Sequence, residues 1–564
     1  MSTGALASTE PRLARQRCGG ACIWIAGAAV TALLVLVPIL SLATLAAGGS
    51  GDAWQHLVAN VLPVATLNTA LLLLGVGVLT IAIGAGAAWL VTAYQFPGRR
   101  VLDWALLLPL AVPTYIVAYA YLDLLHPIGP VQTLIRDILG IASPRDLRLP
   151  DIRSLPGAVL LLGFVLYPYV YLSTRALFLM QASGMIDAAR TLGAGQGRVF
   201  FHVALPLARP AIVVGASLAL METLNDVGAS EFLGVRTLTL SIYSTWINQT
   251  NLAGAAQLAL VMLCLVVVLI AVERAARRGQ RFGTTAQRTA APAPRRLRGL
   301  AAAGALAATL VPVLIGFVFP ALHLVNQAWI RLEFAGFSPR LVGEAWNTVS
   351  VSAIATALVV VAGVVVAYAA RVGDDRLGRG LLRAASLGYA LPGTVVALGL
   401  LAPLAGLDNL VDGAMRQSFG ISTGLLLSGT VAALAYAYAV RFLAISAGGV
   451  DAGLAKVPRR LDYSARTLGE TVSGAFRRVH LPLIRPALGA AAILAFVDCM
   501  KELPATLLLR PLNFETLATH LYGEAARGTY EDGAIAALLI VLVGLLPVVL
   551  LARISRPAVS MAAP

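Results

Sequence analysis

The sequence predicts an all-α integral membrane protein of about twelve transmembrane helices, arranged as two tandem six-helix halves. Composition is the first observation: 59% of the 564 residues are apolar and only 12% are charged, whereas soluble domains are typically about 25% charged. The second is a series of apolar segments long enough to cross a bilayer, which takes about 20 residues. The third is an internal repeat, which identifies a duplication.

The apolar segments form two groups of six, separated by a basic stretch. The first half, residues 1–272, contains segments near 21–46, 64–93, 101–125, 156–178, 207–226 and 254–272. The second half, residues 299–564, contains segments near 299–327, 346–370, 380–404, 421–446, 483–500 and 533–553. Residues 273–298 are rich in Arg, Ala, Thr and Pro without apolar periodicity, which predicts a flexible cytoplasmic linker.

Arginines beside the apolar segments predict how the chain crosses the membrane. The net charge of +15 comes almost entirely from arginine, and short basic loops are typical of the cytoplasmic side. Arg12, Arg15 and Arg17 therefore place the N-terminus in the cytoplasm, and twelve spans return the C-terminus there. The first segment, about 25 residues long, exceeds the 7–15 of a signal-peptide core, so we expect a retained helix. The orientation of the chain in the membrane therefore explains the positive net charge, and no binding of nucleic acid is needed to explain it.

Prolines interrupt the third segment of each half. Pro109 and Pro113 lie in the segment at 101–125, and Pro392 lies in its counterpart at 380–404. Kinks of this kind are tolerated where neighbouring helices satisfy the freed backbone groups. Ordinary helix packing and a gate both remain compatible with this pattern.

The repeat lies between the fourth and fifth segments of each half. Residues 187–212 read DAARTLGAGQGRVFFHVALPLARPAI, residues 463–488 read YSARTLGETVSGAFRRVHLPLIRPAL, and 13 of the 26 positions are identical without a gap. The positions that we expect to matter are an aspartate in the first copy and, in both copies, small residues, a glycine, a phenylalanine and Leu-Pro. They are Asp187, Ala188, Ala189, Gly193, Phe200, Leu205 and Pro206 in the first copy, and Ser464, Ala465, Gly469, Phe476, Leu481 and Pro482 in the second.

Each copy predicts a short helix joined closely to the next membrane helix. Asp187 suits the start of the short helix, and Gly193 suits its end in a left-handed conformation. Pro206 suits the first turn of the next helix, where it costs no hydrogen bond. Phe200 and Phe476 either anchor a partner or pack beneath the loop. In the second copy Tyr463 takes the acidic position and Asp462 precedes it, which leaves the role of the carboxylate open.

This pattern resembles the EAA loop of bacterial ABC-importer permeases. The resemblance implies a type I importer fold in a bacterial cytoplasmic (inner) membrane, with loops 187–206 and 463–482 docking onto two copies of an ABC ATPase subunit. It also implies a periplasmic or surface-anchored substrate-binding protein. A P-loop needs Gly-Lys-Ser/Thr, whereas Lys456 follows Ala and Lys501 follows Met. We therefore expect no enzyme activity and no cofactor in this chain, with ATP and Mg²⁺ bound in the partner subunits.

Rare ionisable and polar residues follow each repeat at spacing i, i+3, i+4, which puts each set on one helix face. At membrane depth such groups usually face a protein interior or an aqueous cavity. One interpretation is a polar ring around a shared translocation pathway, and the other is an intrahelical pair between Lys501 and a neighbouring acid. The candidates are Glu222, Asn225 and Asp226 in the first half and Asp498, Lys501 and Glu502 in the second.

The stretch KELPATLLLRPLNFETLATHLYG, residues 501–523, resembles ferric-iron ABC-transporter permeases, which are commonly two fused six-helix halves. This resemblance implies import of ferric iron by alternating access. Permeases for thiamine, phosphonates and polyamines share the architecture and remain alternatives.

Two other classes fit less well. An ion-coupled secondary transporter also has two six-helix halves, but it has no use for the matched loops. A membrane enzyme lacks support because the six histidines show no metal spacing and no nucleophile motif accompanies them. Cys18, Cys22, Cys264 and Cys499 suggest neither a disulfide framework nor a zinc site, and no metal site is expected.

Overall fold

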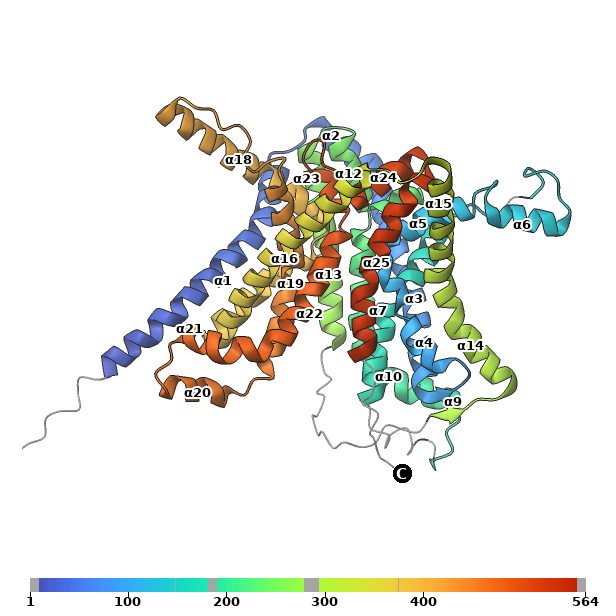
Figure 1. Ribbon diagram of the computed structural model, residues 1–564, viewed down its shortest axis with the longest axis horizontal. Helices are drawn as coiled ribbons and strands as arrows, with labels where there is room; N and C mark the ends of the chain where they lie inside the picture. Colours follow the sequence, from blue (N-terminus) through green and yellow to red (C-terminus); the bar gives the residue numbers. More distant parts are fainter. Residues whose placement is uncertain are drawn as a thin grey trace, which may run out of the picture. The chain divides into compact units, whose positions relative to one another are not determined.

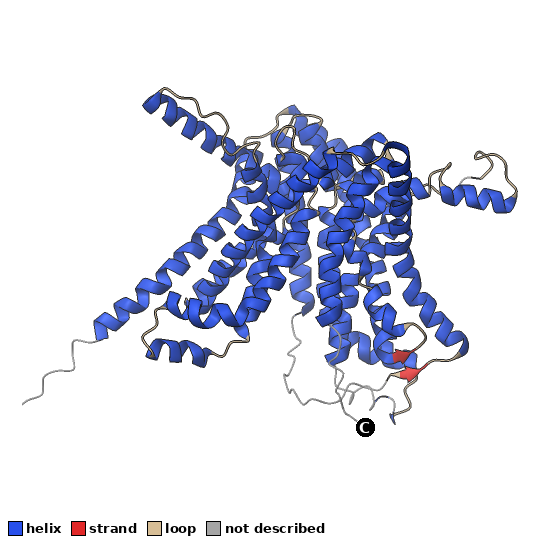
Figure 2. Cartoon of the chain, viewed as in Figure 1, coloured by secondary structure: helices blue, strands red, loops and turns tan. Residues whose placement is uncertain are grey.

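The computed structural model describes residues 10–147, 149–180, 189, 191–277, 294–373 and 375–554. Asp187 and Ala188 lie outside these residues, as does most of the linker at 273–298. Figure 2 shows that the chain is built almost entirely of helices. It forms two compact units: unit 1 comprises Met1–Gly49 and Gly343–Thr516, and unit 2 comprises Ser50–Val342 and Leu517–Pro564. Each unit therefore combines segments from both sequence halves.

Unit 1 contains the first helix of the chain and most of the second sequence half. Its elements are α1 (Glu10–Ala47), α16 (Arg340–Val372, in unit 1 from Gly343), α17 (Asp375–Ala385), η5 (Ser386–Ala390), α18 (Gly393–Phe419), α19 (Val431–Ala455), α20 (Arg459–Thr467), α21 (Val472–Ala475), η6 (Phe476–His480), α22 (Leu481–Met500) and α23 (Pro504–Leu509). Helix α1 packs against α17 and α18, and α19 packs against α22.

Unit 2 contains the rest. Its elements are α2 (Asp52–His56), η1 (Leu57–Val61), α3 (Leu62–Ala93), β1 (Tyr94–Gln95), α4 (Arg99–Ala105), η2 (Leu108–Ala111), α5 (Thr114–Leu124), α6 (Pro130–Leu139), α7 (Leu155–Met180), α9 (Gln196–Val199), η3 (Phe200–Ala204), α10 (Leu205–Asn225), α11 (Gly228–Phe232), α12 (Leu238–Ile247), α13 (Leu252–Arg277), β2 (Arg295–Arg296), α14 (Gly299–Val313), η4 (Leu314–Val318), α15 (Phe319–Ala335), α24 (Leu517–Arg527) and α25 (Tyr530–Ile554).

The core of unit 2 is a layer of long helices, visible on the right of Figure 1. Helices α3, α7 and α10 pack against one another, and α25 packs against α15 and α24. The only strands in the described residues are β1 and β2, which pair in parallel. This pairing fixes the end of the linker, Arg295–Arg296, beside the turn after α3.

Within the described residues, eleven helices are long and apolar enough to cross a membrane, or twelve if one bent pair counts as a single span. These helices overlap all twelve predicted segments, so the all-α membrane fold is confirmed. The bent pair is Arg99–Ala111 with Thr114–Leu124, which meet at 92°. The prolines predicted to interrupt the segment at 101–125 therefore produce a sharp break rather than a mild kink.

The break follows from proline chemistry. A residue before proline is pushed out of the helical region, and Val112, which precedes Pro113, has φ −104° and ψ 119°. The second half repeats this geometry, since Leu391 before Pro392 has φ −85° and ψ 129°. The predicted span at 380–404 is accordingly divided, and the membrane-length helix begins only at Gly393.

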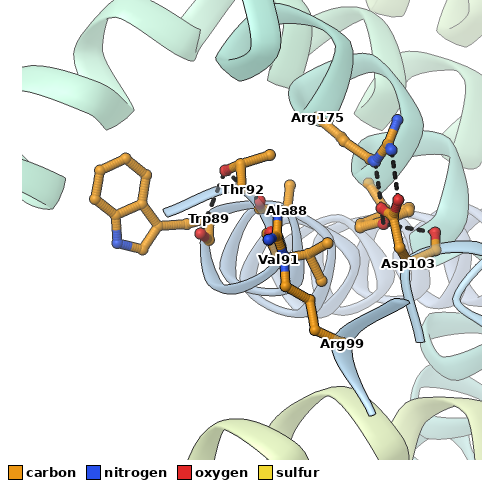
Figure 3. A network of polar contacts seen from close by, with 8 residues as sticks. Ala88, Trp89, Val91, Thr92, Arg99, Asp103 and Arg175 are labelled. Atoms are coloured by element: carbon orange, nitrogen blue, oxygen red, sulfur yellow. Dashed lines mark hydrogen bonds and ion pairs between the residues drawn. The ribbon is translucent and has the colours of Figure 1, made fainter. Parts of the chain in front are cut away.

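A network of polar contacts joins three helices of unit 2 near the repeat loop (Figure 3). Arg175 of α7 binds Asp103 of α4 through two parallel hydrogen bonds, 2.5 Å from Nε and 2.6 Å from Nη2. Tyr171 donates its hydroxyl to the backbone oxygen of Asp103 at 2.9 Å. Arg99 reaches back to the carbonyl of Val91 at 2.6 Å. The network therefore ties the ends of α3 and α4 to the end of α7, which leads into the first repeat.

Replacing Arg175 by alanine should destabilise unit 2. Removing one partner of a fully buried pair costs about 3–5 kcal/mol; the Asp103 side chain is 30% exposed, so we expect about 2–3 kcal/mol. A lower melting temperature of the detergent-solubilised protein would measure the loss. Arg100→Ala, which removes the same charge from an exposed neighbour, is the control. Equal melting temperatures for the two variants would contradict the role of the pair.

Candidate functional site

The two repeat loops, residues 187–206 (first repeat loop) and 463–482 (second repeat loop), share one backbone turn. Gly193 has φ +80° and Gly469 has φ +86°, a left-handed conformation that only glycine adopts without strain. The left-handed conformation that the sequence predicts for Gly193 is therefore present, and Gly469 shares it. In each loop one hydrogen bond spans five residues, as in a Schellman motif. The bonds run from Ala194 N to Ala189 O and from Glu470 N to Ala465 O, each 3.0 Å.

After the turn, each loop re-enters a long helix in the same way. A single helical turn, α9 or α21, leads into one π-helical turn, η3 or η6, and then into the membrane-length helix α10 or α22. Pro206 and Pro482 lie in the first turn of these helices, as the sequence predicts. Leu205 and Leu481, which begin the helices, are half-buried. The loop and the membrane helix thus form one continuous element, Gln196–Asn225 or Val472–Met500.

The repeated phenylalanines begin the π turns and pack inward. The ring of Phe200 lies 5.4 Å from that of Trp89 in α3. The ring of Phe476 lies 4.8 Å from that of Tyr368 in α16 and 5.1 Å from that of Trp24 in α1. Phe476 is only 8% exposed. Phe200 and Phe476 therefore pack beneath the loop, which is one of the two interpretations that the sequence leaves open; the other is that they anchor a partner.

Two exposed leucines were missed by the sequence reasoning. Leu192 is 88% exposed and Leu468 is 84% exposed, and they occupy matched positions directly before Gly193 and Gly469. The signal was present, because both leucines are among the identities of the repeat. Both loops therefore expose a large apolar side chain at the same position. Such a side chain is a candidate contact for a partner protein.

The second repeat loop has an additional polar connection. Asp462 binds Nη2 of Arg371 in α16 at 2.8 Å and lies 2.5 Å from Nε2 of His480 in η6. Arg371 also donates to the carbonyl of Val457 at 3.0 Å. Tyr463, which takes the acidic position of the repeat, points outward and is 62% exposed. The carboxylate one residue earlier therefore fastens α20 to the membrane helix α16.

The small residues of the two repeat loops differ in burial. Ala189 is half-buried, Ala465 is buried and Ser464 is exposed. A Cβ added at Gly193 or Gly469 meets no atom within 4 Å. The surroundings of both glycines are therefore open, and the backbone conformation alone requires glycine there.

At the far end of α10 and α22, two of the predicted pathway residues act as caps. Asp226 Oδ1 accepts from the backbone of Ala229 at 2.8 Å, and Glu502 Oε1 accepts from the backbone of Ala505 at 2.8 Å. Both residues are buried, at 7% and 4% exposure. Each carboxylate satisfies a free N–H at the start of a short helix, α11 or α23.

The remaining pathway candidates differ between the halves. Glu502 also forms a buried ion pair with Arg441 of α19. Lys501 pairs with Asp498 at 2.8 Å, which is the intrahelical pair that the sequence left as one of two interpretations. Glu222 and Asn225 are half-buried. A ring of polar groups around a shared pathway stays a prediction.

Comparison with known proteins agrees with the fold and the duplication. The family model described as "Binding-protein-dependent transport system inner membrane component" matches twice, at residues 79–282 and 359–561. The Fe(3+)-transport system permease protein FbpB 2 of Haemophilus influenzae is 23% identical over 86% of this chain and 89% of its own length.

Shorter relatives resemble part of the chain. The molybdenum transport system permease protein ModB of Escherichia coli is 33% identical over 32% of this chain and 78% of its own length. A 2-aminoethylphosphonate transport system permease protein, PhnV, of Salmonella typhimurium is 27% identical over 46% of this chain and 96% of its own length. Because the family model covers most of the sequence in two copies, the chain belongs to the binding-protein-dependent transport system inner membrane components, as an ABC-importer permease with two fused halves.

Proposed function

We propose that the chain is the membrane-spanning subunit of an ATP-driven importer of ferric iron. Ferric iron is proposed as the substrate because of the extent of the likeness to FbpB 2. This likeness spans 86% of this chain and therefore both halves. The molybdenum permease matches 32% and the 2-aminoethylphosphonate permease 46%. Molybdate, sulfate and phosphonate are the competing substrates, because relatives carry those names.

Hydrolysis of ATP is assigned to two separate ATPase subunits. The sequence has no Gly-Lys-Ser/Thr to cradle phosphates, and each repeat loop offers one docking element. A short helix joined without a break to a membrane helix transmits rigid-body motion, so closure of the ATPases would move α10 and α22. A binding protein would deliver the substrate at the opposite ends of these helices, and both chain termini would lie in the cytoplasm.

A pull-down tests the partners. The wild type should co-purify with an ATPase at two copies per permease, and the double variant Gly193→Arg/Gly469→Arg should lose it. A Cβ at either position meets no neighbouring atom of the permease within 4 Å, so the arginines act by straining the turn and obstructing the docked partner. A wild-type permease that purifies alone and moves substrate without ATP would instead be a secondary transporter.

Uptake into proteoliposomes tests the substrate. The permease, reconstituted together with its ATPase and its binding protein, should accumulate ferric iron only when ATP is supplied on the side of the repeat loops. Molybdate, sulfate and 2-aminoethylphosphonate should not be accumulated. ATP-dependent accumulation of one of these anions, with no uptake of iron, would assign the permease to that substrate.

A further inference from the structure

Each unit has a helical arm at the end opposite its repeat loop. In unit 2 the arm is α6, and in unit 1 it is the last part of α18, residues 405–419. Figure 1 shows α6 extending sideways from the long helices of unit 2, at the end opposite α9, and the end of α18 extending away from unit 1, at the end opposite α20. Each arm is followed by a return segment that leads into the next long helix, α7 or α19.

The α6 arm turns its polar side toward its own chain and leaves its apolar side open. Gln132 and Arg136 are buried and donate hydrogen bonds of 2.9 and 2.6 Å to backbone carbonyls just before the helix. Leu134 and Ile138, by contrast, are 61% and 74% exposed. A helix on the surface of a soluble domain does the reverse and buries its apolar side. The apolar side of α6, at spacing i, i+3, i+4, i+7, consists of Val131, Leu134, Ile135 and Ile138.

The α18 arm reaches the same result through different bonds. Asp408 accepts hydrogen bonds from three backbone N–H groups of the return segment at 2.7–3.1 Å, and Asp412 accepts from two at 2.8 and 3.2 Å. Leu407 and Leu410 are 49% and 71% exposed. Polar donors are covered in one arm and polar acceptors in the other, so the inverted arrangement does not depend on a shared sequence. The apolar side of this arm, again at spacing i, i+3, i+4, i+7, consists of Leu407, Leu410, Val411 and Ala414.

The composition of these two apolar sides suits acyl chains better than a protein partner. All eight residues are aliphatic or alanine, and none is aromatic or charged. The residues that contribute most to protein interfaces are Trp, Tyr and Arg, whereas Leu and Val are under-represented. An amphipathic helix with an aliphatic side is instead typical of the boundary between lipid headgroups and acyl chains.

Both arms begin at the depth of a membrane surface. Gln327 of α15 and the first residues of α6 line one cavity of unit 2. Two residues further along α15, about 3 Å, Trp329 is exposed and donates its indole N–H to Glu333 at 2.9 Å; tryptophan is enriched at membrane–water boundaries. In unit 1, residues 375–404 precede the arm and make roughly 45 Å of helix, enough to cross a hydrocarbon core of about 30 Å.

We propose that both arms are interfacial helices that lie in the surface of the bilayer, with their aliphatic sides among the acyl chains. A helix in this position sinks its apolar side about 5–10 Å into the boundary of the headgroups. The return segments cover the polar sides, and in Figure 1 each return segment arches above its helix and leaves the lower side uncovered. The lipid surface is therefore the partner of both arms, whichever substrate the permease carries.

Spin labels on the full-length permease in nanodiscs of phosphatidylethanolamine and phosphatidylglycerol, one permease per disc, test this placement. Labels at Ile138→Cys and Leu410→Cys report the aliphatic sides. Oxygen, which concentrates among acyl chains, should relax these labels more strongly than a water-soluble nickel chelate does. Asp137→Cys and Asn409→Cys, at exposed polar neighbours, are the controls and should show the reverse order. The native cysteines that are first replaced by alanine are Cys18, Cys22, Cys264 and Cys499.

The outcomes distinguish lipid from other partners without ATPase or iron. Stronger relaxation by the nickel chelate at positions 138 and 410 overturns the proposal. Shielding from both reagents that appears only when the binding protein is added assigns the arms to that protein, and shielding only in discs with two permeases assigns them to a second copy. If the cysteine-free chain does not fold, Ile138→Trp in the native chain should add fluorescence that brominated acyl chains quench, and Asp137→Trp should add fluorescence that they do not.

Discussion

Replacing Leu192 and Leu468 together by glutamate should abolish ATPase association and reduce ATP-dependent uptake to background. The two side chains are 88% and 84% exposed, so the substitution leaves the packing of the permease intact. Burying a leucine side chain contributes about 1.5–3 kcal/mol, which is at least about tenfold in affinity for each loop. A glutamate at the centre of such a contact adds the cost of burying a charge.

The single variants provide an internal comparison. Leu192→Glu and Leu468→Glu should each retain about one ATPase per permease in a pull-down, because each loop binds its own subunit. Leu512→Glu, which changes a leucine that is 96% exposed outside the repeat loops, should retain both. Full ATPase association in the double variant would show that these leucines are not anchors.

Glu502→Gln should destabilise unit 1 strongly, although the substitution is nearly isosteric. Glutamine keeps the oxygen that accepts from Ala505, so the cap of α23 survives, but the buried guanidinium of Arg441 loses the carboxylate that balances its charge. The side chains of the pair are 9% and 2% exposed, and breaking a buried pair from one side costs about 3–5 kcal/mol. The melting temperature should fall on the order of 5–10 °C.

A double-mutant cycle isolates the pair. Arg441→Met combined with Glu502→Gln should be more stable than Glu502→Gln alone, because it removes the uncompensated charge. Asp226→Asn in the other half keeps the same kind of cap and should cost less. A double variant no more stable than Glu502→Gln would mean that the charge pair contributes little.

The fold was predictable to the extent that it depends on composition and local chemistry. Segment length and hydropathy located the membrane helices, and the left-handed glycines at 193 and 469 followed from the repeat. The 92° break after Ala111 was underestimated, because the prolines predicted a kink and the combined extended conformation of Val112 and Pro113 produces a full turn.

Contacts between distant parts of the sequence were not predictable in the same way. The repeat could not indicate that Arg441 would reach Glu502, since the pair joins α19 to the second residue after α22 and both residues lie outside the repeat loops. The sequence likewise did not indicate that Asp226 and Glu502 would be buried caps of the short helices that follow.

The exchange of segments between the units has a consequence for biosynthesis. Helix α1 leaves the ribosome first, yet its packing partners α17 and α18 follow only in the second half of the chain. Unit 2 in turn lacks α24 and α25 until residues 517–554 have been made. Neither unit can finish assembling when only the first half of the chain has been made, although N-terminal domains commonly fold first during synthesis. A prematurely terminated product would therefore expose unfilled helix surfaces in both units, which makes it a ready substrate for membrane proteases.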